Sequence, residues 1–246
     1  MRIITVLIST IILICPAHAG AADPAKSGLS EEQTHIVPIA AFTAAGDIEK
    51  LEAAITEALD AGVPVYDIRE VLIQMYAYAG FPRSLNALTA LADILETREA
   101  SGIEDRLGED ATPLPEDTDM NALGNDVRNQ ITGRDMTTNS AKYAQIAPVI
   151  DVYLKEHLFG DIFSRDVLTH QERELATISA LAAMSGVEAQ LRGHYRVSLT
   201  TGLTPEQLYH FTDILRDRVD PQTAAKAQRI LEEVLQARTE QGASNE

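Results

Sequence analysis

The sequence predicts an all-α protein built from two related helical halves. From residue 29 onward, apolar residues recur every three to four positions along most of the chain, and no stretch shows sustained alternation of period two. Ala, Leu and Ile dominate the composition, Trp is absent and aromatic residues are few, which favours helices. A third observation, an internal repeat, indicates that the helices form two similar units.

The first residues have the pattern of a secretory signal peptide. Arg2 precedes a short apolar run over residues 3–14, Pro16 ends that run, and Ala17-His18-Ala19 fits the small-x-small rule for signal peptidase. A retained membrane anchor is the alternative, but the run is too short to span a bilayer comfortably. We therefore expect a periplasmic or secreted mature protein without stable membrane insertion.

Charge and cysteine content exclude several classes of function. Cys15 is the only cysteine and would leave with the signal peptide, so the mature chain would have neither a disulfide nor a thiolate. The formal net charge of −17 repels nucleic acid, and we expect no nucleic-acid partner. Many apolar helix faces and no disulfide favour a homo-oligomer.

The internal repeat relates the two halves with one inserted residue. Leu29-Ser30-Glu31-Glu32-Gln33 aligns with Leu168-Thr169-His170-Gln171-Glu172 at a shift of 139, which then becomes 140. At the second shift Gly46, Leu51, Gly62 and Ile68 align with Gly186, Leu191, Gly202 and Leu208. Shared glycines and shared caps make a chance likeness of two amphipathic helices improbable.

Helix start and stop signals repeat as well. Ser30 with Gln33, Thr169 with Glu172 and Thr204 with Gln207 each have the spacing of a capping box, and Gly62 and Gly202 fit helix ends. The expected organisation is a signal peptide at 1–19, a flexible leader at 20–28, a first repeat at 29–97, a linker at 98–120, connecting helices at 121–164 and a second repeat at 165–240.

Two stretches resemble the carboxymuconolactone decarboxylase family, relatives of alkylhydroperoxidase D. Arg173-Glu174-Leu175 and the helix carrying His194 resemble its Arg-Glu-Leu and histidine helices, and the segment from Tyr78-Ala79-Gly80-Phe81-Pro82 to Asn86 resembles its Tyr-Ala-Gly-x-Pro helix. The resemblance implies an alkylhydroperoxidase D-like helical fold in two pseudo-symmetric repeats. It also implies a lyase that releases carbon dioxide from a lactone acid.

The chain departs from the family pattern in two ways. The peroxidase branch uses a Cys-x-x-Cys pair beside a histidine, and no cysteine lies in this region, so thiol peroxidase chemistry is excluded. Each repeat is also only half typical: His35 stands opposite Glu174 and Ala54 opposite His194. If the repeats pair about a pseudo-twofold axis, Glu174 and His194 meet the Tyr78–Asn86 segment at one composite site.

The candidate catalytic residues are His194 and Glu174, because an imidazole and a carboxylate against apolar helices suit proton transfer near neutral pH. The candidate substrate-binding residues are Arg83, Tyr78 and Asn86, with Arg83 placed to hold an anion after the Gly80 helix break. All of them except Asn86 have a structural alternative: a core histidine, a helix N-terminal acid, a packing tyrosine or a solvated arginine.

No metal site or cofactor is expected, because His157, His170 and His210 lack partners at ligand spacing. The favoured function is an exported lactone decarboxylase-like enzyme acting on a small molecule. The alternative is a non-catalytic helical module that binds an apolar or aromatic ligand.

Overall fold

The structure is a computed structural model that describes residues 28–138 and 141–243. The predicted signal peptide and residues 20–27 of the predicted leader lie outside these ranges. The helices of the first half are α1 (Glu31–Ala45), α2 (Ile48–Asp60), α3 (Val65–Gln74), α4 (Tyr76–Ala79) and α5 (Phe81–Ala100). Those of the second half are α9 (His170–Ala183), α10 (Glu188–Thr200), α11 (Pro205–Arg218) and α12 (Pro221–Ala243). Between them lie α6 (Met120–Thr132), α7 (Lys142–Ile146), α8 (Val149–Tyr153) and the π-helix η2 (Leu154–Phe163).

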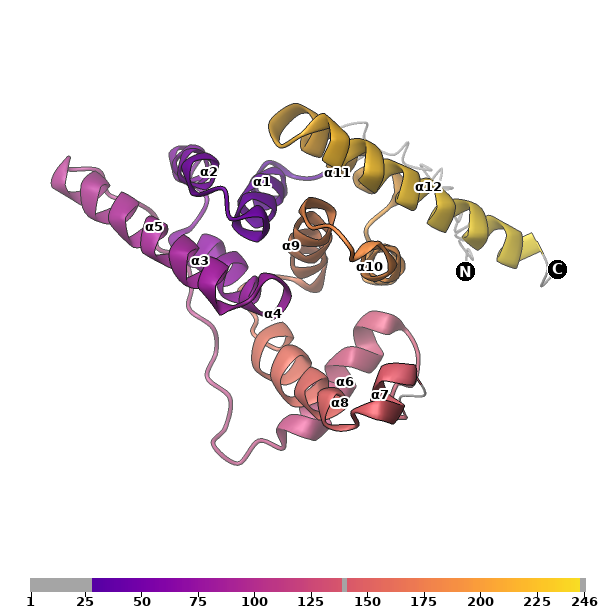
Figure 1. Cartoon of the computed structure of the whole chain (residues 1–246). Helices are drawn as coiled ribbons and strands as arrows, with labels where there is room; N and C mark the ends of the chain where they lie inside the picture. Colours follow the sequence, from indigo (N-terminus) through magenta and orange to yellow (C-terminus); the bar gives the residue numbers. More distant parts are fainter. Residues whose placement is uncertain (1–27, 139–140, 244–246) are drawn as a thin grey trace, which may run out of the picture.

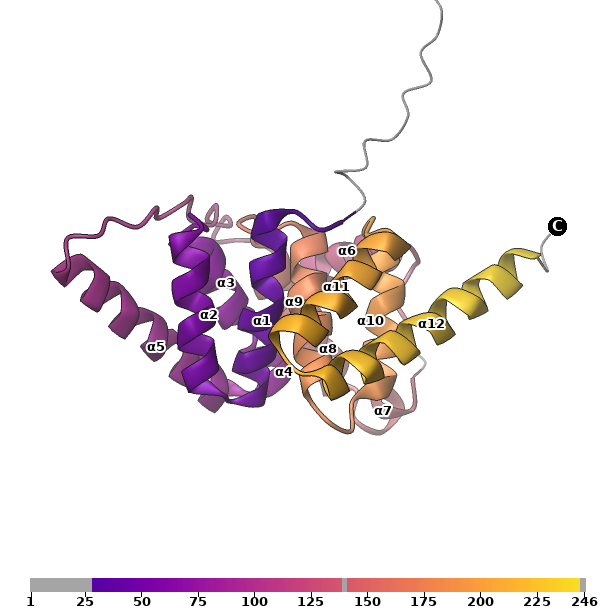
Figure 2. The same cartoon turned by 90° about the horizontal axis from the view of Figure 1, so that it is seen from above.

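The two halves are copies of one arrangement, as the repeat predicts. Helices α1, α2 and α5 correspond in order to α9, α10 and α12, and α3 together with the short α4 corresponds to α11. Helices α1 and α9 lie side by side at the centre, while α5 and α12 extend on opposite outer sides (Figures 1 and 2). The described ranges contain no strand, so the predicted all-α class and the two-repeat fold are confirmed.

Capping boxes begin the corresponding helices α1 and α9 and also α11, whose counterpart α3 has no side-chain cap. Ser30, Thr169 and Thr204 each accept a hydrogen bond from the backbone three residues later, and the Gln or Glu there bonds back to the cap. These reciprocal bonds satisfy backbone donors that the first helical turn leaves unpaired. Gly62 and Gly202 follow α2 and α10 with φ angles of 84° and 104°, a conformation that glycine adopts without steric cost.

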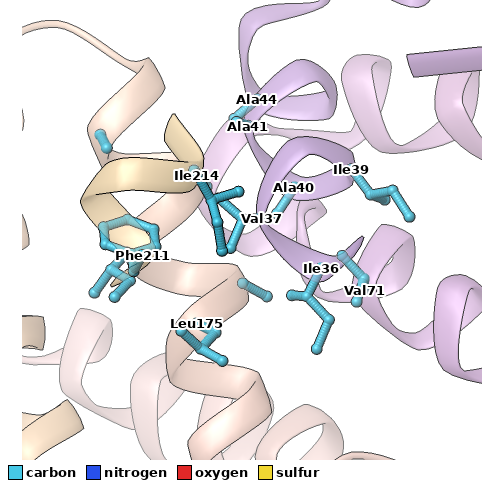
Figure 3. Close-up of a cluster of buried hydrophobic side chains, with 14 of the residues drawn as sticks. Ile36, Val37, Ile39, Ala40, Ala41, Ala44, Val71, Leu175, Phe211 and Ile214 are labelled. Carbon is cyan, nitrogen blue, oxygen red and sulfur yellow. The ribbon is translucent and has the colours of Figure 1, made fainter. Parts of the chain in front are cut away.

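The central helix α1 is buried on all sides, which is unusual for a helix of a small domain. Residues 35–44 are all buried, and α1 packs against Val71, Leu175, Phe211 and Ile214 of α3, α9 and α11 (Figure 3). Pro38 interrupts its hydrogen bonding, because proline cannot donate to the carbonyl of Thr34 four residues earlier. The Nη1 of Arg218 supplies that bond instead, at 3.4 Å.

The segment between the repeats forms a separate small helical unit. After α5, which extends to Ala100, a loop leads to α6, and α6 crosses η2 at very short distance. A Cβ added at Gly124 would lie 1.7 Å from the carbonyl oxygen of Lys155, so only glycine permits this crossing. Val127, Ile131, Ile162 and Phe163 form the unit's own apolar cluster. Among the described helices, none is both long and apolar enough to cross a membrane.

Candidate active site

Glu174 and His194 form a hydrogen-bonded pair between the first two helices of the second repeat. His194 Nδ1 lies 2.9 Å from Oε2 of Glu174, which is fully buried, while the His194 side chain retains 22% of its exposure. A carboxylate at Nδ1 holds the ring in the tautomer that leaves Nε2 as the proton acceptor. The pair therefore has the arrangement of a histidine base with an orienting acid.

Tyr78 of α4 brings the first repeat to this pair. Its ring meets that of His194 edge-on, with centroids 5.8 Å apart and an interplanar angle of 78°. Burial, followed by the negative charge of Glu174, raises the pKa of Tyr78 well above its usual value. The phenol consequently stays protonated at all working pH values and can donate a hydrogen bond.

Two buried polar groups at this site are poorly satisfied within the described part of the chain. Oε1 of Glu174 is buried and has no hydrogen-bond partner among the described residues, and the buried hydroxyl of Tyr78 has only the Thr177 hydroxyl beside it, outside good hydrogen-bond geometry. Buried polar groups are nearly always paired, so such atoms call for a functional explanation. Beside the imidazole, the phenol offers a hydrogen-bond donor and the carboxylate oxygen an acceptor.

A glutamine fixes the two repeats relative to each other beside the pair. Gln74, at the end of α3, donates from Nε2 to the Arg173 carbonyl at 2.8 Å and to Thr177 Oγ1 at 3.0 Å. Its Oε1 accepts from Arg173 Nη1 at 3.2 Å. Gly80 then ends α4 with a φ of 85°, which lets the chain turn into α5 directly after Tyr78. Gln74 thus sets the position of the Glu174 helix against the Tyr78 segment.

A buried ion cluster lies next to the site and was not predicted from the sequence. Glu70 is fully buried and accepts two hydrogen bonds from Arg165, at 2.7 and 2.8 Å, and one from the fully buried Arg173 at 3.3 Å. Burial alone would raise the pKa of Glu70, but the bonds and charges of the two arginines outweigh it and lower that pKa. Glu70 and Gln74 lie four residues apart on an otherwise apolar face of α3. That spacing is the sequence feature that could have indicated a buried polar cluster.

Apolar side chains of the connecting helices cover the site on another side. Tyr76, Tyr78 and Val197 pack against the apolar cluster of α6 and η2, which includes the buried Phe163. Tyr76 also forms a hydrogen bond to Nε2 of His157, whose Nδ1 lies 2.6 Å from Asp161. The surroundings of His194 therefore combine a buried carboxylate, a phenol and an aromatic and aliphatic cover.

The predicted site residues divide into two groups. The structure brings His194, Glu174 and Tyr78 together, as the composite arrangement predicts. Arg83 instead donates from Nη1 to the Ala44 carbonyl at 2.5 Å, at the end of α1, and Asn86 is exposed on α5. No contact in the described ranges joins either residue to the pair.

The equivalent place in the first repeat has no such pair. His35 occupies the position of Glu174, Ala54 that of His194, and Arg218 that of Tyr78. Burial and the positive charge of Arg218 lower the pKa of His35, and its Nδ1 is buried without a partner. The pseudo-symmetric place therefore provides an internal control for the chemistry of the second.

The described residues contain no group of three or more His, Cys, Asp or Glu side chains placed to hold a metal ion. Glu174 and His194 form only a pair. Asp67, in the first turn of α3, lies near other carboxylates, those of Glu172, Glu32 and Glu70.

Comparison with known proteins agrees with the resemblance seen in the sequence and with the two-repeat fold. The model of the carboxymuconolactone decarboxylase family matches residues 16–93 and 152–233. Peroxisomal protein 2 of Schizosaccharomyces pombe is 29% identical over 189 residues, which cover 72% of this chain and 82% of that protein. Peroxisomal protein 2 of Saccharomyces cerevisiae is 29% identical over 161 residues, or 56% of this chain and 55% of that protein. Because the family model matches well over half of the chain, in two regions that coincide with the two repeats, the chain belongs to the carboxymuconolactone decarboxylase family.

Proposed function

We propose that the chain is an acid–base enzyme of the lactone decarboxylase type, in which His194 moves the proton. The observation that carries the proposal is the 2.9 Å bond between His194 Nδ1 and the buried Glu174, with the Tyr78 ring against the imidazole. The family supports the reaction type, and the three side chains supply groups that this reaction needs.

The proposed step is loss of carbon dioxide from a small unsaturated lactone acid. The bond between the carboxylate carbon and the ring breaks, and its electron pair passes into the conjugated lactone carbonyl. Tyr78 donates a hydrogen bond to the oxygen that becomes negative. Protonated His194 then delivers a proton from Nε2 to carbon, while Glu174 orients the ring and stabilises its charged form.

The surroundings favour this step over binding of a permanent anion. Within the described residues no free guanidinium or ammonium group contacts His194 or Tyr78, because Arg173 is engaged by Glu70 and Gln74. A substrate carboxylate placed against the apolar cover of α6 and η2 is poorly solvated. Its charge is dispersed as carbon dioxide leaves, so the apolar cover favours the transition state over the bound acid.

The test is an assay of carbon dioxide release from a panel of lactone acids. We expect turnover by the wild type, about a hundredfold loss in Tyr78→Phe because an oxyanion donor is removed, and a smaller loss in Glu174→Gln. Circular dichroism of each variant checks that the helices remain. Equal turnover in the wild type and Tyr78→Phe would contradict the assigned role of the phenol.

The second candidate function is a non-catalytic binding module, which the aromatic and aliphatic cover favours. Here the site holds an apolar or aromatic ligand and His194 serves as a polar contact. Absence of turnover on every lactone acid, together with an apolar ligand recovered by mass spectrometry from purified protein, would support this candidate. Retained affinity for that ligand in His194→Ala would then assign the pair a structural role.

We also propose that the protein is exported, since Arg2, the apolar run and Ala17-His18-Ala19 have the order of a signal peptide. The two relatives are named as peroxisomal proteins, which is a different compartment, and their name states no reaction. N-terminal sequencing of the protein from its native cells should begin at Gly20 or Ala22. An intact Met1 on cell-associated protein would contradict export.

Self-association is proposed as well. Ile146 of α7 is 88% exposed, and Val149, Ile150 and Tyr153 of α8 are exposed beside it. Apolar side chains gathered in this way usually mark an interaction surface. A homo-oligomer that buries the surface of α7 and α8 explains why they are apolar.

A further inference from the structure

Two adjoining hollows lie where α10 meets α12 and the end of α6. One, of about 430 Å³, is lined by Thr132, Arg134, Gly193, Arg196, Val197, Thr200 and Gln241. The other, of about 300 Å³, shares Arg196, Thr200 and Gln241 and adds Leu199, Val234, Ala237 and Arg238. Because they share these three residues, the two hollows form one cleft along α10. Helix α10 itself lies between α12 and α6 (Figure 1). We refer to this cleft as the arginine cleft.

The charge of the arginine cleft is opposite to that of the chain as a whole. It carries Arg134, Arg196 and Arg238, and no carboxylate among the described residues lines either hollow, whereas the formal net charge of the chain is −17. Within the described ranges none of the three guanidinium groups has an ion-pair or hydrogen-bond partner. Elsewhere on α10 and α12 the arginines are paired: Arg192 and Arg229 both bind Glu233.

The remaining lining also suits a ligand with an anionic head. The hydroxyls of Thr132 and Thr200 donate to carbonyls of their own helices, so they line the cleft as neutral groups without a free donor. The side-chain amide of Gln241 provides a further donor. Leu199, Val234 and Ala237 give one end of the cleft an apolar floor. Their side chains can contact a small hydrocarbon or aromatic body.

We infer that the arginine cleft binds a small organic oxyanion with at least two negative charges, either a phosphate monoester or a dicarboxylate. Guanidinium groups match phosphate and carboxylate oxygens with paired hydrogen bonds, and unpaired ones are free to do so. The volume lies in the range of small-ligand sites. The acidic remainder of the surface repels nucleic acid, which leaves a compact anion as the ligand that fits.

The site is independent of the proposed enzyme function. Arg196 and Thr200 face away from Glu174 along α10, since His194 and Arg196 are two positions apart on the helix. Of the cleft residues, Gly193 precedes His194 in sequence and Val197 packs against the apolar cover of the His194 site. A ligand in the cleft therefore contacts neither Glu174 nor Tyr78, and binding can be measured without any turnover.

Isothermal titration calorimetry with phenyl phosphate and with phthalate, in a low-salt buffer free of phosphate, tests the inference. We expect one molecule of at least one probe to bind per chain, and about tenfold weaker binding in Arg196→Gln, because this side chain lines both hollows. A preference for phenyl phosphate assigns a phosphate monoester, and a preference for phthalate assigns a dicarboxylate.

Arg216→Gln is the matched control. Arg216 is an exposed arginine of α11 outside the cleft, and its loss changes the net charge by the same amount. Binding in this variant should stay within about twofold of the wild type, since one distant charge is screened. No binding of either probe to the wild type would overturn the inference. Equal weakening in Arg196→Gln and Arg216→Gln would overturn it too, because the attraction would then be non-specific.

Discussion

Asp67 of α3 should destabilise the folded protein at neutral pH, so its replacement by asparagine should raise stability. Burial, followed by the nearby negative charges of Glu172 and Glu32, raises the pKa of Asp67 from 3.8 to about 6. The folded state therefore binds a proton at this carboxyl more tightly than the unfolded state does. Such a group contributes stability below pH 3.8, and that contribution is lost as the pH rises toward 6.

The size of the effect follows from the same pKa. A rise from 3.8 to about 6 corresponds to about 3 kcal/mol once the carboxyl is ionised in both states. The gain in the free energy of unfolding in Asp67→Asn should therefore be about 1 kcal/mol at pH 4.5 and about 3 kcal/mol at pH 8. Relaxation of the surroundings and solvent screening reduce these values, so they are upper bounds.

Urea denaturation of the wild type and Asp67→Asn across this pH range measures the gain directly. Asp93→Asn is the control, because Asp93 is an exposed residue of α5 and its loss changes the charge equally. Its stability should follow that of the wild type at every pH. The reasoning would be refuted if the free energy of unfolding gained in Asp67→Asn did not grow with pH, or if the variant were less stable than the wild type at pH 8.

Three further predictions test the packing. Glu70→Gln should lower the free energy of unfolding by about 3–5 kcal/mol at pH 7 in urea denaturation, because the buried Arg173 loses its counter-charge. The difference in unfolding free energy between wild type and variant should narrow as the pH falls through the lowered pKa of Glu70. A difference that stays constant with pH would count against the ion cluster. Gly124→Ala should cost at least about 2 kcal/mol and raise hydrogen exchange in residues 120–163 before the rest of the chain, because its Cβ meets the Lys155 carbonyl; unchanged exchange there would contradict the close crossing. Sedimentation at micromolar concentration should show a homo-oligomer that Ile146→Asp shifts toward the monomer, and a monomeric wild type would contradict self-association.

Local rules and the repeat allowed much of the fold to be predicted from the sequence. The hydroxyl caps at Ser30, Thr169 and Thr204 are local interactions, so the sequence contains all the information they need. The pairing of α1 with α9 follows from the repeat, because two copies of one apolar unit bury their faces against each other. The pseudo-twofold arrangement then places Tyr78 beside His194.

Contacts that depend on detailed tertiary geometry were not predictable. Arg83 follows a helix break, which suggested an anion site, but the chain folds so that the Ala44 carbonyl lies within its reach. The ion cluster of Glu70 joins residues 95 and 103 positions apart, and no local pattern indicates which partners meet. The arginine cleft likewise arises from three segments. The sequence of α10 alone predicts only that Arg196 lies on the face opposite His194, and it does not indicate a cleft.

The central claim is that His194 moves the proton, and not His35, which lies at the equivalent place in the first repeat. The most direct test compares His194→Ala with His35→Ala on one lactone acid that the wild type decarboxylates, with circular dichroism to check folding. His194→Ala should lose about 10²–10⁴-fold in turnover, because a general acid–base group is removed. His35→Ala should keep most of the activity, since Ala54 and Arg218 leave that place without the pair. Equal turnover in the two variants would contradict the account.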